Sequence, residues 1–135
     1  MMYISRRIRF SASHRLHNPA LSDEENRNIF GACNNPHGHG HDYDVEVVVA
    51  GEPDPKTGMF LNLRDLKHVL ERYVTGPADR RSLDHEVPFM QGRISTTENL
   101  AMAIWNEVAP RLPAGTLHLV RVRESDNNVV EYTGP

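Results

Sequence analysis

The segment that follows His41 constrains the fold more than any other, because valines and charged residues alternate along it towards Gly51. A period of two is typical of a β-strand, in which successive side chains point to opposite faces of a sheet. We predict a strand over about residues 42–51. His39 and His41 are two residues apart at its start, so the same geometry directs both imidazoles to one face.

Two imidazoles on one face supply half of a tetrahedral metal site. A third ligand from a distant segment would leave the open position that catalytic zinc uses. His14 is our preferred third ligand, because it ends an alternating segment that can pair beside this strand. His37 has the same parity as the pair and is the alternative, but Pro36 and Gly38 indicate that the chain is still in a loop there.

Cys33 is the only cysteine of the chain and lies in an Asn- and Pro-rich loop, six residues before His39. A thiol in such a loop beside a divalent cation has the surroundings of a reactive thiolate rather than of an inert buried cysteine. The spacing also allows Cys33 to bind the metal itself, which would close the site with four protein ligands and make it structural. Both interpretations stay open on these residues alone.

Asp84 and His85 form a second candidate acid/base unit. Adjacent side chains in a loop can face one cleft, where a carboxylate orients an imidazole for proton transfer. The dipeptide alone is weak evidence, because a capped turn before Pro88 would have the same sequence.

Seven short motifs are spread in order over nearly the whole chain. They are Phe10-Ser-Ala-Ser-His-Arg-Leu16, Leu21-Ser-Asp-Glu-Glu-Asn26, Cys33-Asn-Asn-Pro36, Gly38-His-Gly-His41, Leu83-Asp-His85, Ser95-Thr-Thr-Glu-Asn99 and Glu124-Ser-Asp-Asn-Asn128. Together they resemble the 6-pyruvoyl-tetrahydropterin synthase family, and the set is far more specific than any single motif.

The resemblance implies a zinc enzyme with a thiol base. The Zn²⁺ ligands that it implies are His14, His39 and His41. The groups that it implies for proton transfer are Cys33 as general base, with Asp84 and His85 as its relay partners.

The resemblance also implies a pterin pocket. Glu124 would belong to the catalytic residues as the anchor of the pterin, because a carboxylate accepts the two parallel N–H donors of a 2-amino-4-oxopyrimidine edge. Thr96 and Thr97 would touch the ring, although the first turn of a helix explains both residues equally well.

The implied reaction converts 7,8-dihydroneopterin triphosphate to 6-pyruvoyl-tetrahydropterin and eliminates triphosphate, as a carbon–oxygen lyase acting on phosphates. Zinc would acidify the substrate side chain, and the Cys33 thiolate would remove the proton. A basic side chain should hold the triphosphate. The sequence does not choose among the candidates Arg6, Arg7, Arg15, Arg27 and Lys67.

Two alternatives remain. The 6-carboxy-tetrahydropterin synthases of queuosine biosynthesis act on the same substrate, although the long step from Cys33 to His39 favours the pyruvoyl enzyme. His37 and Asp42 stand where the animal enzymes usually have Asn; these differences leave the zinc ligands intact and bear on the choice of substrate. A zinc-stabilised pterin-binding module is the non-enzymatic alternative.

Length and charge agree with a small enzyme. A chain of 135 residues is expected to form one domain, residues 1–135. A net charge of -3 does not indicate the basic surface that nucleic-acid binding requires. The sequence has no long apolar run that would indicate a membrane span or a signal peptide. The lone cysteine excludes an internal disulfide and fits a reducing cytoplasm.

The expected fold is α+β, with element order β-β-α-α-β-β. We predict strands over about residues 3–14, 42–51, 117–123 and 129–132, a helix capped by Asn62 that ends near Gly76, and a second helix from Thr96 to about Ala109 with a Ser95/Glu98 capping box. These elements would form a four-stranded antiparallel sheet with two helices on one face.

The free edges of such a sheet favour pairing between copies. The resemblance implies the tunnelling fold (T-fold), in which three subunits close a barrel and two trimers stack into a homohexamer. Active sites then lie at subunit interfaces.

Overall fold

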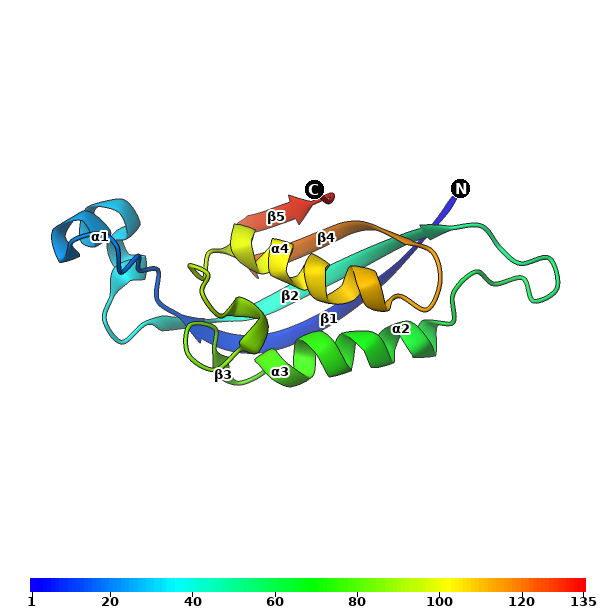
Figure 1. The fold of residues 1–135 in the computed structure, drawn as a ribbon, viewed down its shortest axis with the longest axis horizontal. Coiled ribbons are helices and arrows are strands. Elements are labelled where there is room, and N and C mark those ends of the chain that lie inside the picture. Colours follow the sequence, from blue (N-terminus) through cyan, green and yellow to red (C-terminus); the bar gives the residue numbers. More distant parts are fainter.

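A single sheet forms the framework of the computed structural model, which describes all residues 1–135 (Figure 1). Its strands are β1 (Met2–His14), β2 (His39–Gly51), β3 (Arg81–Ser82), β4 (Thr116–Ser125) and β5 (Asn128–Tyr132). Their order is β3-β1-β2-β4-β5, and every neighbouring pair is antiparallel except β1 and β3. The four expected strands are therefore present.

The short strand β3 corrects the expected number of strands from four to five. It pairs in parallel with β1 at Ala12 and Ser13. Backbone hydrogen bonds from Arg80 N to Ser11 O and from Leu83 N to Ser13 O, at 2.6 and 2.8 Å, extend this pairing. The sequence does not reveal such a strand, because backbone groups at the free edge of β1 hold it and no side-chain periodicity is needed.

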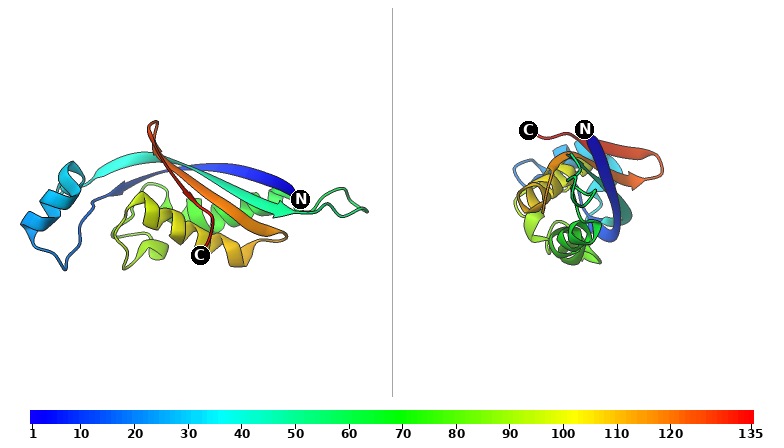
Figure 2. Two further views of the ribbon diagram at one scale, coloured as in Figure 1. Left: turned by 90° about the horizontal axis from the view of Figure 1, so that it is seen from above. Right: turned by 90° about the vertical axis from the view of Figure 1, so that its right-hand side faces the viewer.

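Two helices cover one face of the sheet, as the sequence predicts (Figures 1 and 2). α2 (Leu63–Leu70) begins at the predicted cap Asn62, whose side chain accepts a hydrogen bond from Arg64 N at 2.9 Å. It continues through a π-helical turn (Glu71–Thr75) and the short α3 (Gly76–Ala78). The second covering helix is α4 (Thr97–Val108).

The start of α4 corrects the predicted capping box. Thr96 is the N-cap, and its hydroxyl accepts a hydrogen bond from Asn99 N at 3.2 Å. The predicted cap, Ser95, is 1% exposed and donates its hydroxyl to a carboxylate oxygen of Asp84 at 2.5 Å. The Ser95 side chain therefore makes a tertiary hydrogen bond instead of capping the helix, as the local sequence would predict.

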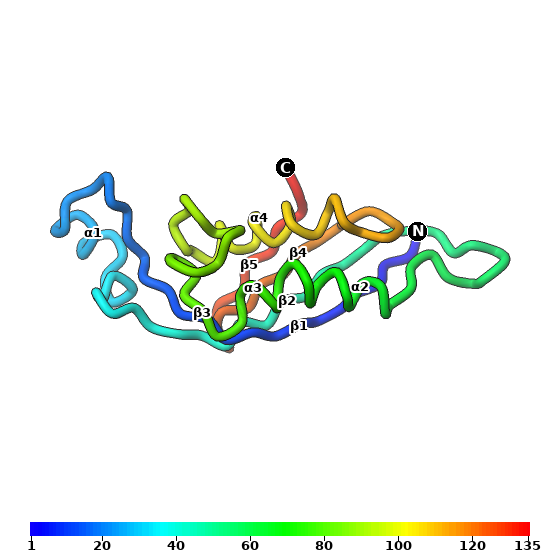
Figure 3. Tube along the Cα trace, turned by 60° about the horizontal axis from the view of Figure 1, so that its bottom comes forward, coloured from blue at the N-terminus to red at the C-terminus, as the bar shows by residue number.

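A third helix, α1 (Asp23–Phe30), lies beyond one end of the sheet, outside the two layers (Figure 3). The sequence predicts only a long Asn- and Pro-rich connection between the first two strands, and the structure corrects that expectation. Ser22 and Glu25 form a reciprocal capping box that starts the helix. A 3₁₀ turn (Gly31–Asn34) follows and carries Cys33 towards β2. Further 3₁₀ turns span Pro88–Met90 and Ala109–Arg111.

The hydrophobic core lies between the helices and the inner face of the sheet. Val45, Val47 and Val49 of β2 are fully buried there, which confirms the alternation seen in the sequence. Leu66 and Leu70 of α2 pack into the same cluster. None of the helices has the length and apolar character needed to cross a membrane.

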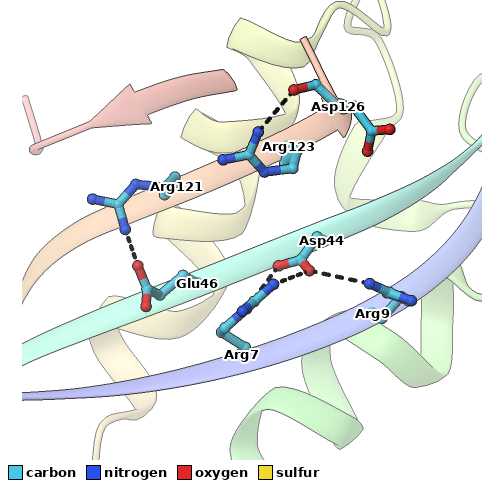
Figure 4. A network of polar contacts seen from close by, with 7 residues as sticks. All are labelled: Arg7, Arg9, Asp44, Glu46, Arg121, Arg123 and Asp126. Atoms are coloured by element: carbon cyan, nitrogen blue, oxygen red, sulfur yellow. Dashed lines mark hydrogen bonds and ion pairs between the residues drawn. The ribbon is translucent and has the colours of Figure 1, made fainter. Parts of the chain in front are cut away.

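The helix-free face of the sheet is polar and carries a network of ion pairs (Figure 4). Arg7 donates two hydrogen bonds to Asp44, at 3.2 and 2.5 Å, and Arg9 reaches the same carboxylate. Arg121 of β4 bridges Glu46 of β2 and a glutamate of β5. The hydrogen bond from Arg7 lowers the pKa of Asp44, and the same pair raises the pKa of Arg7.

Candidate active site

Three histidines meet at the end of the core face. The register of β1 and β2 places His14 opposite His39 and Ala12 opposite His41, so that all three imidazoles share one face. Their metal-ligating atoms lie within 4.8 Å of one another. The ring centroids are 4.9 to 5.0 Å apart in each pair. This cluster can bind a metal ion.

His14 has the orientation expected of a metal ligand. It is 2% exposed, and its Nδ1 lies 2.7 Å from the carbonyl oxygen of Ser95, to which it donates. The hydroxyl of Tyr43 lies 3.5 Å from the same nitrogen. Donation from Nδ1 leaves the Nε2 lone pair free, and Nε2 is buried without a hydrogen-bond partner. A bare buried acceptor nitrogen is costly unless a ligand occupies it, so the site fits a cation.

His41 shows the same feature, since its Nε2 is also buried without a hydrogen-bond partner. Desolvation lowers the pKa of His41, and the nearby His14 and His39 lower it further against the opposing effect of Glu124. A lowered pKa favours the neutral imidazole, which is the form that ligates metals. The chemistry of the donor set therefore matches that of a metal centre.

Gly38 explains how the chain enters β2 so close to β1. Its φ is +70°, and a Cβ at this position would lie 2.8 Å from the carbonyl oxygen of His14. Only glycine tolerates both the left-handed conformation and this contact. The glycine lets the chain turn directly into β2, where His39 faces His14.

Glu124 lies at the edge of the histidine cluster. Its Oε1 is 3.7 Å from Nε2 of His41, and its Oε2 accepts a short hydrogen bond from the hydroxyl of Thr97. Glu124 and Thr97 line a cavity of about 410 Å³ together with Glu98, Asn127 and Asn128. The carboxylates of Glu98 and Glu124 make this an acidic cavity, which we call the acidic pocket. Thr96 is placed differently, because its side chain caps α4.

Asp84 supports His14 through Ser95 rather than binding His85. One of its carboxylate oxygens accepts a hydrogen bond from Arg15 N at 2.6 Å, and the other accepts from the Ser95 hydroxyl at 2.5 Å. Both oxygens are thus engaged, and the exposed His85 has no hydrogen bond to Asp84. Ser95 is a site residue that sequence reasoning missed. Its only signal is the Ser-Thr-Thr-Glu string, which suggests a helix cap instead.

Cys33 is half-buried in its 3₁₀ turn and lies outside the three-histidine cluster. Its carbonyl accepts a hydrogen bond from Leu16 N at 2.8 Å. The next residue, Asn34, is 4% exposed and donates its amide to Leu16 O at 2.7 Å and to His17 Nδ1 at 3.1 Å. These bonds fix the Cys33 turn against the end of β1. His37 is exposed in the turn before β2 and also lies outside the cluster.

A family model described as 6-pyruvoyl tetrahydropterin synthase matches residues 3–135. The chain belongs to the 6-pyruvoyl tetrahydropterin synthase family. It is accordingly an enzyme, and the family's members are lyases.

Relatives of known sequence and structure support membership of this synthase family. A human 6-pyruvoyl tetrahydrobiopterin synthase is 54% identical over 131 residues, which cover 97% of this chain and 90% of the human protein. The Drosophila melanogaster protein of the same name is 45% identical and is covered to 80%. The solved Caenorhabditis elegans 6-pyruvoyl tetrahydropterin synthase superposes with a TM-score of 0.93 at 38% identity, over 99% of this chain and 96% of that one. A Plasmodium falciparum 6-pyruvoyl tetrahydropterin synthase, at 15% identity and a TM-score of 0.66, shares the fold.

Proposed function

We propose that the protein converts 7,8-dihydroneopterin triphosphate to 6-pyruvoyl-tetrahydropterin and releases triphosphate. One observation carries this proposal: the carboxylate of Glu124 lies 3.7 Å from a nitrogen of the three-histidine cluster. A group that can recognise a pterin therefore adjoins a centre that can hold a metal. Relatives named for this activity, at up to 54% identity, support the same choice over the 6-carboxy product.

We infer that the metal is Zn²⁺, held by His14, His39 and His41. Three imidazoles with one position left open match the donor set of catalytic zinc. When bound, zinc supplies Lewis acidity to the hydroxyl groups of the substrate side chain. Cys33 lies outside the cluster, which supports the three-ligand site over a closed four-ligand structural one.

Glu124 and Thr97 would recognise the pterin. A carboxylate accepts the N–H donors at N3 and at the 2-amino group in bidentate fashion. Thr97 already donates to Oε2 of Glu124 and so holds the carboxylate in one orientation. Thr96 would act indirectly, by capping the helix that carries Thr97.

Cys33 would be the general base that removes a proton from the substrate side chain, and His85 would take part in the proton relay. The exposed His85 lines a cavity together with His14, so proton exchange with solvent is available on that side. Asp84 would contribute by holding Ser95 and Arg15, and through them His14, in place. Because both oxygens of Asp84 bind these other groups, the imidazole of His85 is free to move.

We also propose a homohexamer of two barrel-forming trimers in the cytoplasm. β1 is paired on its outer side only at Ala12 and Ser13, and β5 has no outer neighbour, so both edges of the sheet can accept another strand. The polar face in Figure 4 would then line the inside of the barrel, where solvent can hydrate its ion pairs. A free thiol used in catalysis suits a reducing compartment.

The test is a product analysis with purified, metal-quantified protein. Incubation with 7,8-dihydroneopterin triphosphate should release triphosphate and give 6-pyruvoyl-tetrahydropterin by mass. A 6-carboxy product with acetaldehyde would contradict the assignment. Cys33→Ala should keep one zinc per chain and lose turnover, whereas loss of zinc together with folding would indicate a structural site.

A further inference from the structure

The hydroxyl of Tyr43 lies in the hydrophobic core with little to bind. Tyr43 is fully buried on the core face of β2, two residues after His41. The one hydrogen-bonding atom within reach of its hydroxyl is Nδ1 of His14, at 3.5 Å. A buried hydroxyl with a single long contact is costly, because it has given up its hydrogen bonds to water. Phenylalanine would fill the same space without that cost, so any benefit of the hydroxyl lies at His14.

The ring of Tyr43 joins the two strands that carry the metal ligands. It stacks on Phe10, its register partner on β1, with ring centroids 5.3 Å apart. It meets His41 edge-on at 5.6 Å and His14 at 6.3 Å. Ala12 lies between Phe10 and His14 on the same face of β1, and its small side chain leaves room for the phenol. The hydroxyl therefore reaches diagonally across the strand pair to His14.

Two oxygen atoms lie around Nδ1 of His14. The carbonyl oxygen of Ser95 is 2.7 Å away and can only accept, so Nδ1 must carry the proton. The Tyr43 oxygen faces the same N–H as a second, longer acceptor. A forked hydrogen bond of this kind favours the tautomer whose Nε2 lone pair is free, and that nitrogen is buried without a partner.

A cation at Nε2 of His14 would strengthen this fork. It withdraws electron density from the imidazole, so the N–H at Nδ1 becomes a better donor and a second acceptor gains value. In the metal-free protein the imidazole is a weaker donor, and the carbonyl of Ser95 already satisfies it. The contribution of the Tyr43 hydroxyl therefore belongs to the metal-bound state.

We propose that Tyr43 is a positioning residue of the metal centre, whose hydroxyl shares the Nδ1 proton of His14 with the Ser95 carbonyl. The inference rests on the function proposed above, because it takes the three-histidine cluster as the zinc site. The alternation along β2 assigns Tyr43 only to the core, so its position beside His14 comes from the strand register. The hydroxyl lowers the stability of the fold and in return fixes a zinc ligand.

The experiment compares Tyr43→Phe with Tyr132→Phe, which removes the same hydroxyl from a half-buried ring that packs on Trp105. Zinc affinity is measured without substrate, by competition with a chromophoric chelator. Tyr43→Phe should bind zinc about tenfold more weakly, at the low end of the effect of an outer partner, because Ser95 still accepts the proton. Tyr132→Phe should bind zinc as the wild type does. Equal affinities of the wild type and Tyr43→Phe would overturn the role of the hydroxyl.

Urea unfolding separates positioning from packing. Metal-free Tyr43→Phe should be at least as stable as the metal-free wild type, because the costly buried hydroxyl is gone. A fixed excess of zinc should then stabilise the variant less than the wild type, in proportion to its weaker affinity. A loss of stability that is the same with and without zinc would make Tyr43 an ordinary core residue.

The shared proton is tested by combining Tyr43→Phe with Asp84→Ala, which releases the Ser95 segment. The Tyr43 oxygen then becomes the main acceptor, so its removal should cost more zinc affinity in that background than in the wild type. Equal costs in the two backgrounds would show that the two residues do not act on one N–H, and would overturn the fork. Absence of turnover with 7,8-dihydroneopterin triphosphate would refute the proposed synthase function alone, because zinc binding is measured without substrate.

Discussion

The carbonyl oxygen of Ser95 accepts a hydrogen bond from His14 Nδ1 at 2.7 Å, and this bond orients the buried imidazole towards the metal position. The hydroxyl of the same serine donates to Asp84. A chain of contacts thus runs from the loop that carries Asp84 to a metal ligand on β1. Outer partners of this kind tune both the orientation and the basicity of a ligating histidine.

Asp84→Ala should therefore weaken zinc binding as well as turnover. Loss of the carboxylate frees Ser95 and Arg15 N, and we expect a decrease in zinc affinity of about 10- to 100-fold. Competition with a chromophoric chelator measures it. Asp126→Asn, in the exposed turn between β4 and β5, is the matched control and should bind zinc normally. Unchanged zinc affinity in Asp84→Ala would assign Asp84 to the proton relay instead.

Asn34 should govern the reactivity of Cys33. Asn34→Ala removes the buried amide that holds Leu16 O and His17 Nδ1, and it should cost about 1–3 kcal/mol in the free energy of unfolding. The released turn should expose the Cys33 thiol, so alkylation by iodoacetamide should become faster. Asn28→Ala, on the exposed surface of α1, is the control. An alkylation rate equal to that of the wild type would argue against the proposed role of Asn34.

Gly38→Ala should disturb the metal centre through the backbone. The new Cβ would lie 2.8 Å from His14 O in addition to the strain of φ +70°. Gly58 has a φ of +74°, and a Cβ added there would have no atom within 4 Å, so Gly58→Ala isolates the conformational strain, about 1 kcal/mol. We expect Gly38→Ala to lose more stability than Gly58→Ala, by urea unfolding, and to lose zinc affinity as well. Equal losses would mean that the contact with His14 relaxes freely.

Asp44 should contribute to the acid sensitivity of the fold. Its pKa is lowered from 3.8 in the folded protein, chiefly by the hydrogen bond from Arg7. The unfolded chain therefore binds this proton more readily, so the contribution is fully present above the unfolded pKa and is lost as the pH falls through the folded pKa. The difference in unfolding free energy between the wild type and Asp44→Asn should shrink on acidification from pH 6 to pH 3. A difference that stays constant over this range would exclude the linkage.

Local sequence is a good guide where periodicity and capping decide the structure. The alternation along β2 predicts its inner face, and the predicted cap at Asn62 is the one observed, because both depend on interactions within a few residues. The capping box at Ser22 is also present in the sequence, but the short helix that follows it lacks an apolar stripe and is therefore not predicted. Ser95 fails as a predicted cap because Asp84 competes for its hydroxyl from eleven residues away.

The sequence by itself determined the family, the strand that presents His39 and His41 on one face, and the candidate residues for zinc, base and pterin. These follow from residue identity and short-range geometry. Only the tertiary structure decided that His14 faces His39 across two strands, that Ser95 and Asp84 support this ligand, and that Glu124 lies at the edge of the histidine cluster. Each of these depends on strand register and long-range hydrogen bonds between segments up to 81 residues apart, which no local pattern encodes.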